Sequence, residues 1–102
     1  MDKELKCVLY HYHEGEGGEF REVRLYATGE GIDMSAQDMG PSVEHFWGDS
    51  DYEFGVRVKP EHVNALVFAL LKDKYEGAIS GVDEFRSFCK ANKIPCDWWN
   101  WA

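Results

Sequence analysis

The fold of this chain is decided by the stretch from Tyr52 to Leu71, which reads YEFGVRVKPEHVNALVFALL. Up to Val58 its apolar and polar residues alternate, which is the period of a β-strand with one face covered. Pro60 is a residue favoured in the first turn of a helix. After it the apolar residues recur at helical spacing, at Val63, Leu66, Val67, Leu70 and Leu71. The stretch therefore predicts a strand that ends near Lys59 and a helix that begins at Pro60.

Three further segments on the N-terminal side alternate in the same way. They are Leu5 to His13, Phe20 to Ala27 and Ile32 to Gln37. The segments 14–18 and 28–31 between them are rich in glycine, which supplies the positive φ angles of tight turns. One helical turn is expected from Pro41 to Phe46. The first part of the chain therefore predicts four strands, joined mostly by short turns.

A second helix is expected after Ser80. Ser80 and Asp83 have the spacing of a capping pair. The apolar residues of one helical face follow at Val82, Phe85, Phe88 and Cys89. Strands first and helices afterwards are typical of an α+β domain. We therefore expect a single α+β domain over residues 1–102, with a four-stranded antiparallel meander followed by two helices packed on one face.

The other face of such a sheet must be exposed to solvent or covered by something else. Strict alternation in the first strand places Cys7 and Leu9 on one face and Tyr10 and Tyr12 on the opposite face. The candidates for the exposed face are Tyr10, Tyr12, Arg21, Arg57 and Lys59.

The three cysteines are an odd number and have no metal-ligand spacing. Cys7 and Cys89 fall in apolar-periodic segments and are expected in the core, whereas Cys96 is expected to be more accessible. The N-terminus has no apolar signal core, and no apolar run is long enough to cross a bilayer. These features predict a cytoplasmic protein without a membrane partner.

The charge of the chain is concentrated in one third of its length. The whole chain has 19 acidic and 11 basic residues and a formal net charge of −8. Between Arg24 and Arg57 no lysine or arginine occurs, and the acids there are Glu30, Asp33, Asp38, Glu44, Asp49, Asp51 and Glu53. A block of one sign shapes the electric field that a partner meets. We expect this acidic block to form one rim around Phe46 and Trp47.

The acidic block predicts a non-catalytic domain that binds a basic protein partner. Opposite charges speed the encounter of two proteins, and aromatic residues supply buried anchors. An acidic immunity-type inhibitor of a basic toxin or enzyme is the concrete form of this hypothesis. A nucleic-acid partner is not expected, because the block would repel phosphates. The candidate partner-binding residues are Glu44, Phe46, Trp47, Asp49, Asp51, Tyr52, Glu53, Trp99 and Trp101.

Tryptophan is concentrated at the C-terminus, at Trp98, Trp99 and Trp101. In a strand, Trp99 and Trp101 would share one face and Trp98 would take the other. One interpretation is that this tail docks across the sheet or the helices and stabilises the fold. The alternative is that the tail is an aromatic contact surface for a partner.

The segment from Gln37 to Gly40, followed by Val43 to Glu53, resembles a family of small uncharacterised bacterial proteins. These proteins have a glutamine–aspartate turn before an acidic aromatic run that ends in Tyr-Glu, as Tyr52-Glu53 does here. They also tend to end in an Ile-Pro segment followed by aromatics, as Ile94-Pro95 does here. Ala36 stands where that turn often has glycine. The resemblance covers residues 32–101 and implies a compact fold, with no established activity and no catalytic residues.

A small metal-binding protein or enzyme is the alternative function. Asp49, Asp51 and Glu53 alternate with other residues and could offer oxygen ligands to a cation, but Pro60 stands where a calcium loop needs glutamate. His11 and His13 could share a zinc ion only with further ligands from elsewhere. No nucleophile motif is present. We therefore expect no enzyme activity, metal or cofactor. Self-association through a strand edge or the tryptophan tail is a third possibility.

Overall fold

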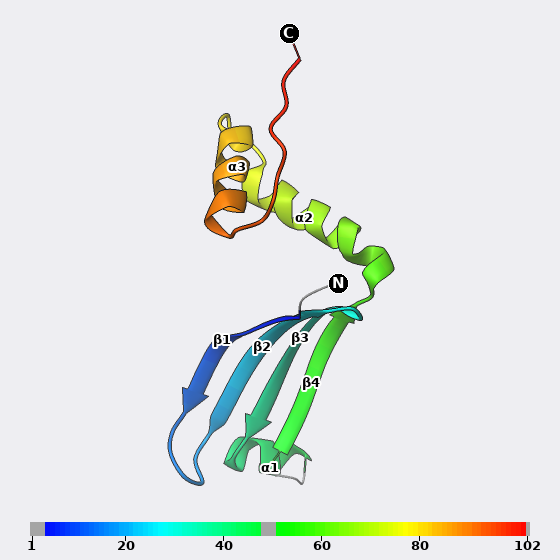
Figure 1. Ribbon diagram of the computed structural model, residues 1–102. Helices are drawn as coiled ribbons and strands as arrows, with labels where there is room; N and C mark the ends of the chain where they lie inside the picture. Colours follow the sequence, from blue (N-terminus) through cyan, green and yellow to red (C-terminus); the bar gives the residue numbers. More distant parts are fainter. Residues whose placement is uncertain (1–3, 48–50, 102) are drawn as a thin grey trace. The chain divides into compact units, whose positions relative to one another are not determined.

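The computed structural model describes residues 4–47 and 51–101, and of residues 46 and 47 the backbone. It divides into two compact units, Met1–Leu66 and Val67–Ala102, which are described one at a time (Figure 1). Four strands come first and the long helices follow, so the predicted α+β class is confirmed. The packing of both helices on one sheet face, and the single domain, stay predictions.

The first unit is a four-stranded antiparallel sheet in the order β1-β2-β3-β4, which confirms the meander (Figure 1). The strands are β1 (Leu5–His13), β2 (Phe20–Thr28), β3 (Gly31–Met39) and β4 (Asp51–Val58). The third strand is longer at its C-terminal end than the predicted Ile32 to Gln37. Its extra residues pair with β2, since Asp38 lies opposite Arg21 and Met39 opposite Phe20.

A β-bulge in β1 overturns the predicted alternation of that strand. Val8 pairs with Arg24, but the next pair is Tyr10 with Val23, so Leu9 is the extra residue. A bulge shifts every later side chain to the other face. Tyr10 and Tyr12 consequently share a face with Cys7 instead of lying opposite to it. Arg57 lies on the opposite face of the sheet from Tyr10. The prediction that the five candidate residues share one solvent-exposed face is therefore wrong.

The register gives the sheet one apolar face and one polar face. The apolar face has Leu25, Met34 and Val56 in a single cross-strand row. Arg21 and Asp38 lie on this face too, and the guanidinium of Arg21 donates two hydrogen bonds to the carboxylate of Asp38. The cross-strand neighbours on the polar face are described with the candidate site below.

The residues that the structure describes include only three buried hydrophobic side chains, Ala36, Val43 and Cys89. The core prediction is therefore confirmed for Cys89 and wrong for Cys7, which is exposed. Cys7 lies in the same cross-strand row as Met34 and Val56, which are exposed as well. Cys96 is exposed, as expected.

Helix α1 (Pro41–Trp47) lies at one end of the sheet, between β3 and β4 (Figure 1). Its start is held by the β1–β2 hairpin, because the backbone N–H of Ser42 donates to Glu19 Oε1 at 2.8 Å. Gly40 permits the close approach: its φ is +118°, and a Cβ there would meet the carbonyl oxygen of Gly18 at 2.7 Å. Val43 of α1 is buried as a result of this packing.

The predicted helix after Pro60 begins with a 3₁₀ turn, η1 (Pro60–His62), and continues as α2 (Val63–Tyr75). In the second unit α3 (Gly81–Ala91) contacts α2 through the rings of Tyr75 and Phe85, whose centroids lie 6.0 Å apart. Ser80 precedes α3 but makes no side-chain capping hydrogen bond, so the predicted capping pair with Asp83 is wrong. The backbone of Ser80 is not extended (φ −99°, ψ 26°), unlike that of a typical N-cap.

Across residues 4–47 and 51–101, none of the helices combines the length and the apolar character that crossing a membrane requires.

Candidate functional site

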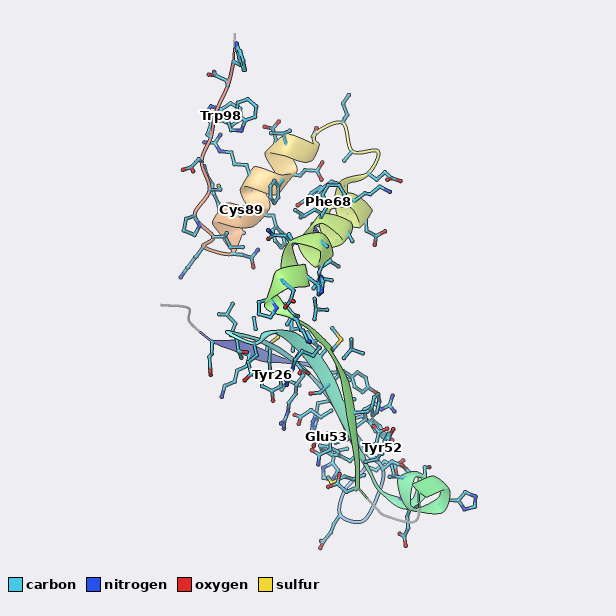
Figure 2. The ribbon with its side chains drawn as sticks, turned by 90° about the vertical axis from the view of Figure 1, so that its right-hand side faces the viewer. Tyr26, Tyr52, Glu53, Phe68, Cys89 and Trp98 are labelled. Carbon is cyan, nitrogen blue, oxygen red and sulfur yellow. The ribbon has the colours of Figure 1, made fainter. Side chains whose placement is uncertain are left out.

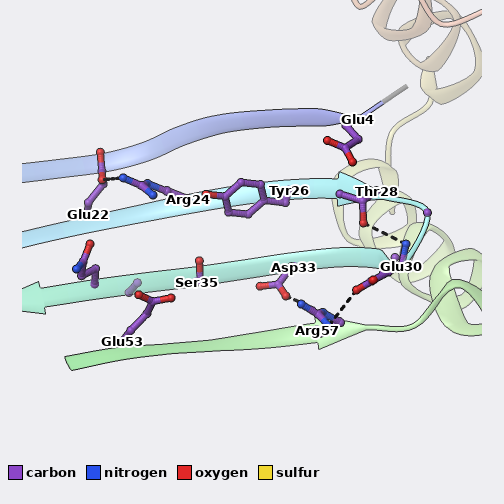
Figure 3. Close-up of a pocket in the computed structure, with 14 residues that line it drawn as sticks. Glu4, Glu22, Arg24, Tyr26, Thr28, Glu30, Asp33, Ser35, Glu53 and Arg57 are labelled. Atoms are coloured by element: carbon purple, nitrogen blue, oxygen red, sulfur yellow. Dashed lines mark hydrogen bonds and ion pairs between the residues drawn. The ribbon is translucent and has the colours of Figure 1, made fainter. Parts of the chain in front are cut away.

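The polar face of the sheet is hollowed over β2, β3, β4 and the β2–β3 turn, and this polar-face hollow has a volume of about 490 Å³ (Figure 3). Its charged lining residues are Glu4, Glu22, Arg24, Glu30, Asp33, Glu53 and Arg57. Five of these are acids and two are arginines, so the lining carries a formal charge of −3.

Strand register explains why these side chains gather on one face. Glu22 lies opposite Gln37, which in turn lies opposite Glu53. Four residues away on each strand, after one intervening row, Tyr26 and Arg57 flank Asp33 in the same way. These rows place acidic side chains from three neighbouring strands on the same surface.

The intervening row consists of Arg24, Ser35 and Gly55, and a depression beside the hollow lies over its β3–β4 part, because Ser35 is small and Gly55 has no side chain. A Cβ at Gly55 would meet the carbonyl oxygen of Met34 at 2.9 Å and Ser35 Cβ at 3.0 Å. Glycine at this place therefore lets β3 and β4 approach and leaves a gap between Glu53 and Arg57 (Figure 3).

Both arginines of the hollow are already engaged by acids of the same face. Arg57 Nε donates to Asp33 Oδ2 at 2.8 Å, and Arg57 Nη1 lies 3.3 Å from Glu30 Oε2. The hydrogen bond with Asp33, together with the charges of Asp33 and Glu30, raises the pKa of Arg57 above its ordinary value. The guanidinium is therefore fixed as a cation that offsets part of the acidic charge.

Arg24 lies in the middle of the hollow beside Tyr26 and Glu22. Its guanidinium donates a hydrogen bond to Glu22 Oε2, and its interactions with Tyr26 and Glu22 raise the pKa of Arg24. Tyr26 lies flat along the strand between Arg24 and the β2–β3 turn (Figure 3). Glu4 and Glu53 take part in none of these ion pairs, so their carboxylates supply the excess negative charge.

The candidate partner-binding residues of the fourth strand are divided between the two faces. Glu53 lines the polar-face hollow, and Asp51 shares its face and accepts a hydrogen bond from Gln37 Nε2 at 3.1 Å. Tyr52 lies on the opposite face and stacks on Phe54, with ring centroids 5.3 Å apart. Viewed along the sheet, Tyr26 and Glu53 project to one side and Tyr52 to the other (Figure 2).

The other members of the predicted acidic rim are spread along the sheet. Glu44 is exposed on α1, at one end of the sheet, whereas Glu30 lies in the β2–β3 turn at the other. Phe46 and Trp47 belong to α1, but their side chains, like the whole of Asp49, lie outside the described residues. A single rim around these aromatics is therefore wrong for the acids that the structure describes.

Residues 94–101 of the C-terminal tail do not form a strand, so the alternation that a strand would give the tryptophans does not apply. Trp98 contacts α3, where the guanidinium of Arg86 lies 5.0 Å from the centre of a Trp98 ring. Trp99 and Trp101 are 75% and 90% exposed. Trp98 and Trp99 border an apolar groove of about 970 Å³ within the second unit, which Phe85 also lines.

His11 and His13 share the polar face with Phe20, and the rings of both histidines meet the Phe20 ring edge-on at 5.4 and 5.5 Å. His11 Nδ1 lies 3.6 Å from a carboxylate oxygen of Glu22. Within the described part of the chain, no three His, Cys, Asp or Glu residues form a group that could hold a metal ion.

The hollow contains residues that the sequence did not single out, chiefly Glu22, Arg24 and Tyr26. Their signal is the alternation of β2, which puts these three on one face. This alternation identifies a site only when the register between β2 and its neighbouring strands is known.

No protein-family model, no curated protein and no solved structure matches this chain.

Proposed function

We propose that this chain is a non-catalytic domain that binds a basic protein partner through the polar-face hollow. Inhibition of a basic toxin or enzyme, in the manner of an immunity protein, is the concrete form of this proposal. Its main support is the formal charge of −3 on the lining of the hollow. The resemblance to small bacterial proteins stays a prediction.

The arrangement of the charges favours a cationic side chain as the group that is bound. Arg57 bridges Asp33 and Glu30, so these three groups form a fixed network before any partner arrives. Glu53 lies on the same face and forms no ion pair with the residues that the structure describes. A lysine or arginine of a partner would enter the depression over Gly55 and meet Glu53 on β4. Such preorganised carboxylates give specificity and a fast encounter more than they give affinity.

The test compares two double variants that change the net charge equally. Glu30→Gln with Glu53→Gln removes two carboxylates from the hollow. Glu76→Gln with Glu84→Gln removes two from the helical unit. The pairs are matched, because Glu30 is 3.3 Å from Arg57 and Glu76 is 3.4 Å from Lys72.

The probe is a fluorescent peptide rich in arginine and lysine, and binding is measured by anisotropy at low and high salt. We expect the hollow variant to weaken binding about three- to tenfold at low salt, which corresponds to two modest charge contacts. The control variant should weaken it less than about twofold, because its two carboxylates do not line the hollow and exposed charges are screened by salt. Equal weakening by both variants, or affinity that is independent of salt, would refute the proposal.

A further inference from the structure

The end of α3 reverses the direction of the chain through two backbone hydrogen bonds. The N–H of Ile94 donates to the carbonyl of Cys89 at 2.8 Å, and the N–H of Lys93 donates to the carbonyl of Lys90 at 3.1 Å. Lys93 has a φ of +57°. This combination is a Schellman motif, in which a left-handed residue follows the helix. The chain therefore turns back along the last turn of α3.

The reversal brings Cys96 beside Cys89. Cys96 follows Ile94 by two residues, with the rigid Pro95 between them. Both cysteines line the apolar groove of the second unit, Cys89 on the last turn of α3 and Cys96 two residues beyond the hydrogen bond from Ile94 to Cys89. Burial, and after it the neighbouring Cys96, raises the pKa of the Cys89 thiol. A chain reversal that brings two cysteines into one groove makes them candidates for a disulfide.

The two thiols differ in access to solvent. Cys96 is exposed, whereas Cys89, on α3 (Figure 2), is only 5% exposed. Burial first, and then the neighbouring Cys96, raises the pKa of the Cys89 thiol. A thiol with a raised pKa is a poor first nucleophile, and an exposed one is reached first by an oxidant. The pair is therefore asymmetric, with Cys96 as the reacting thiol and Cys89 as the resolving thiol.

We propose that Cys89 and Cys96 form a reversible disulfide, which a hydroperoxide closes and a small-molecule thiol reopens. The Cys96 thiolate attacks one oxygen of hydrogen peroxide, the O–O bond breaks, and the products are a sulfenic acid and hydroxide, which takes up a proton to become water. The Cys89 sulfur then attacks the Cys96 sulfur. The S–S bond forms, the S–O bond breaks, and the second water leaves with the Cys89 proton. Two electrons pass from the dithiol to the peroxide.

The disulfide would fix the start of the tryptophan tail on α3. In the reduced chain the tail is attached by the backbone hydrogen bonds of the motif and by the contact of Trp98 with Arg86. A covalent link at Cys96, two residues before Trp98, would restrict both Trp98 and the exposed Trp99. This inference is independent of the basic partner proposed for the sheet.

The experiment uses the full chain, reduced and then treated with hydrogen peroxide. Cys7→Ser is the matched control, since Cys7 is an exposed cysteine of the other unit. We expect the wild type and Cys7→Ser each to lose two titratable thiols and about 2 Da as monomers. Peptide mapping should find Cys89 joined to Cys96, and dithiothreitol should restore both thiols. Cys96→Ser should form no intramolecular disulfide.

Two outcomes in chains that keep both cysteines would overturn the proposal. One is oxidation of Cys96 to a sulfinic acid in Cys7→Ser without a link to Cys89. The other is a wild-type disulfide that involves Cys7. Replacement of the buried Cys89 could disturb folding, so Cys89→Ala is compared with the exposed-site variant Cys96→Ser, and helicity is checked by circular dichroism. A Cys96→Ser variant that keeps its helicity and still loses two thiols would also refute the inference.

Discussion

Replacement of Lys93 by glycine should stabilise the helical unit. Lys93 adopts a φ of +57° at the end of α3. A residue with a Cβ is less stable in this left-handed conformation by about 1–2 kcal/mol, and glycine avoids that strain. Glycine also gains conformational entropy in the unfolded chain, which offsets about 0.4–1 kcal/mol of the benefit. We therefore expect Lys93→Gly to raise the free energy of unfolding by about 0.5–1 kcal/mol.

The measurement is urea denaturation followed by circular dichroism at a helical wavelength. With a slope of about 1–2 kcal/mol per molar, the midpoint should rise by about 0.5 M. Lys90→Gly is the control, because it makes the same chemical change three residues earlier, inside α3. There glycine should cost about 0.5–1 kcal/mol. A lower midpoint for Lys93→Gly, or a shift of the same sign in both variants, would refute the reasoning.

The remaining predictions concern two single side chains. Tyr75→Phe should leave the midpoint of unfolding unchanged or raise it, because the Tyr75 hydroxyl is buried without a hydrogen-bond partner in the described part of the chain. Tyr12→Phe, which removes a hydroxyl that is hydrogen-bonded to Glu14, is the control, and a clear loss of stability in Tyr75→Phe would contradict the prediction. Glu14 accepts hydrogen bonds from the Glu19 backbone N–H and the Tyr12 hydroxyl, and these contacts lower the pKa of Glu14 below 4.5. The ionised Glu14 therefore stabilises the β1–β2 hairpin fully above about pH 4.5, and this stabilisation is lost as the pH falls through the lowered pKa. Glu14→Gln should lack this acid transition in the amide resonance of Glu19, and an identical titration in both proteins would argue against the assignment.

Much of the fold was predictable from periodicity, and the exceptions have physical causes. The change of period at Pro60 is confirmed by β4 and by η1 followed by α2. The bulge at Leu9 was missed, although the neighbouring apolar pair Val8-Leu9 already interrupts the alternation. Sequence alone does not say which of two adjacent apolar residues is the unpaired residue of the bulge, because this depends on how the strand pairs with its neighbour.

The candidate site was less predictable than the strands that form it. The acidic block was visible in the sequence, but the face on which each acid lies depends on the register of neighbouring strands. Glu53 and Asp33 lie on one face, whereas Asp38 lies on the other and is paired with Arg21. The depression itself arises where Gly55 lies opposite Ser35, a pairing between segments far apart in the sequence.

The bulge at Leu9 also affects how this sheet meets other chains. Within the described residues of the first unit, β1 pairs with β2 on one side only, so its other side presents backbone N–H and C=O groups that no strand of the sheet pairs with. A straight edge of this kind is a template on which strands of other molecules add and fibrils grow. The extra residue twists the strand and interrupts the row of hydrogen-bonding groups partway along it. The irregularity that reorients Tyr10 and Tyr12 therefore also protects the open edge of the sheet against aggregation.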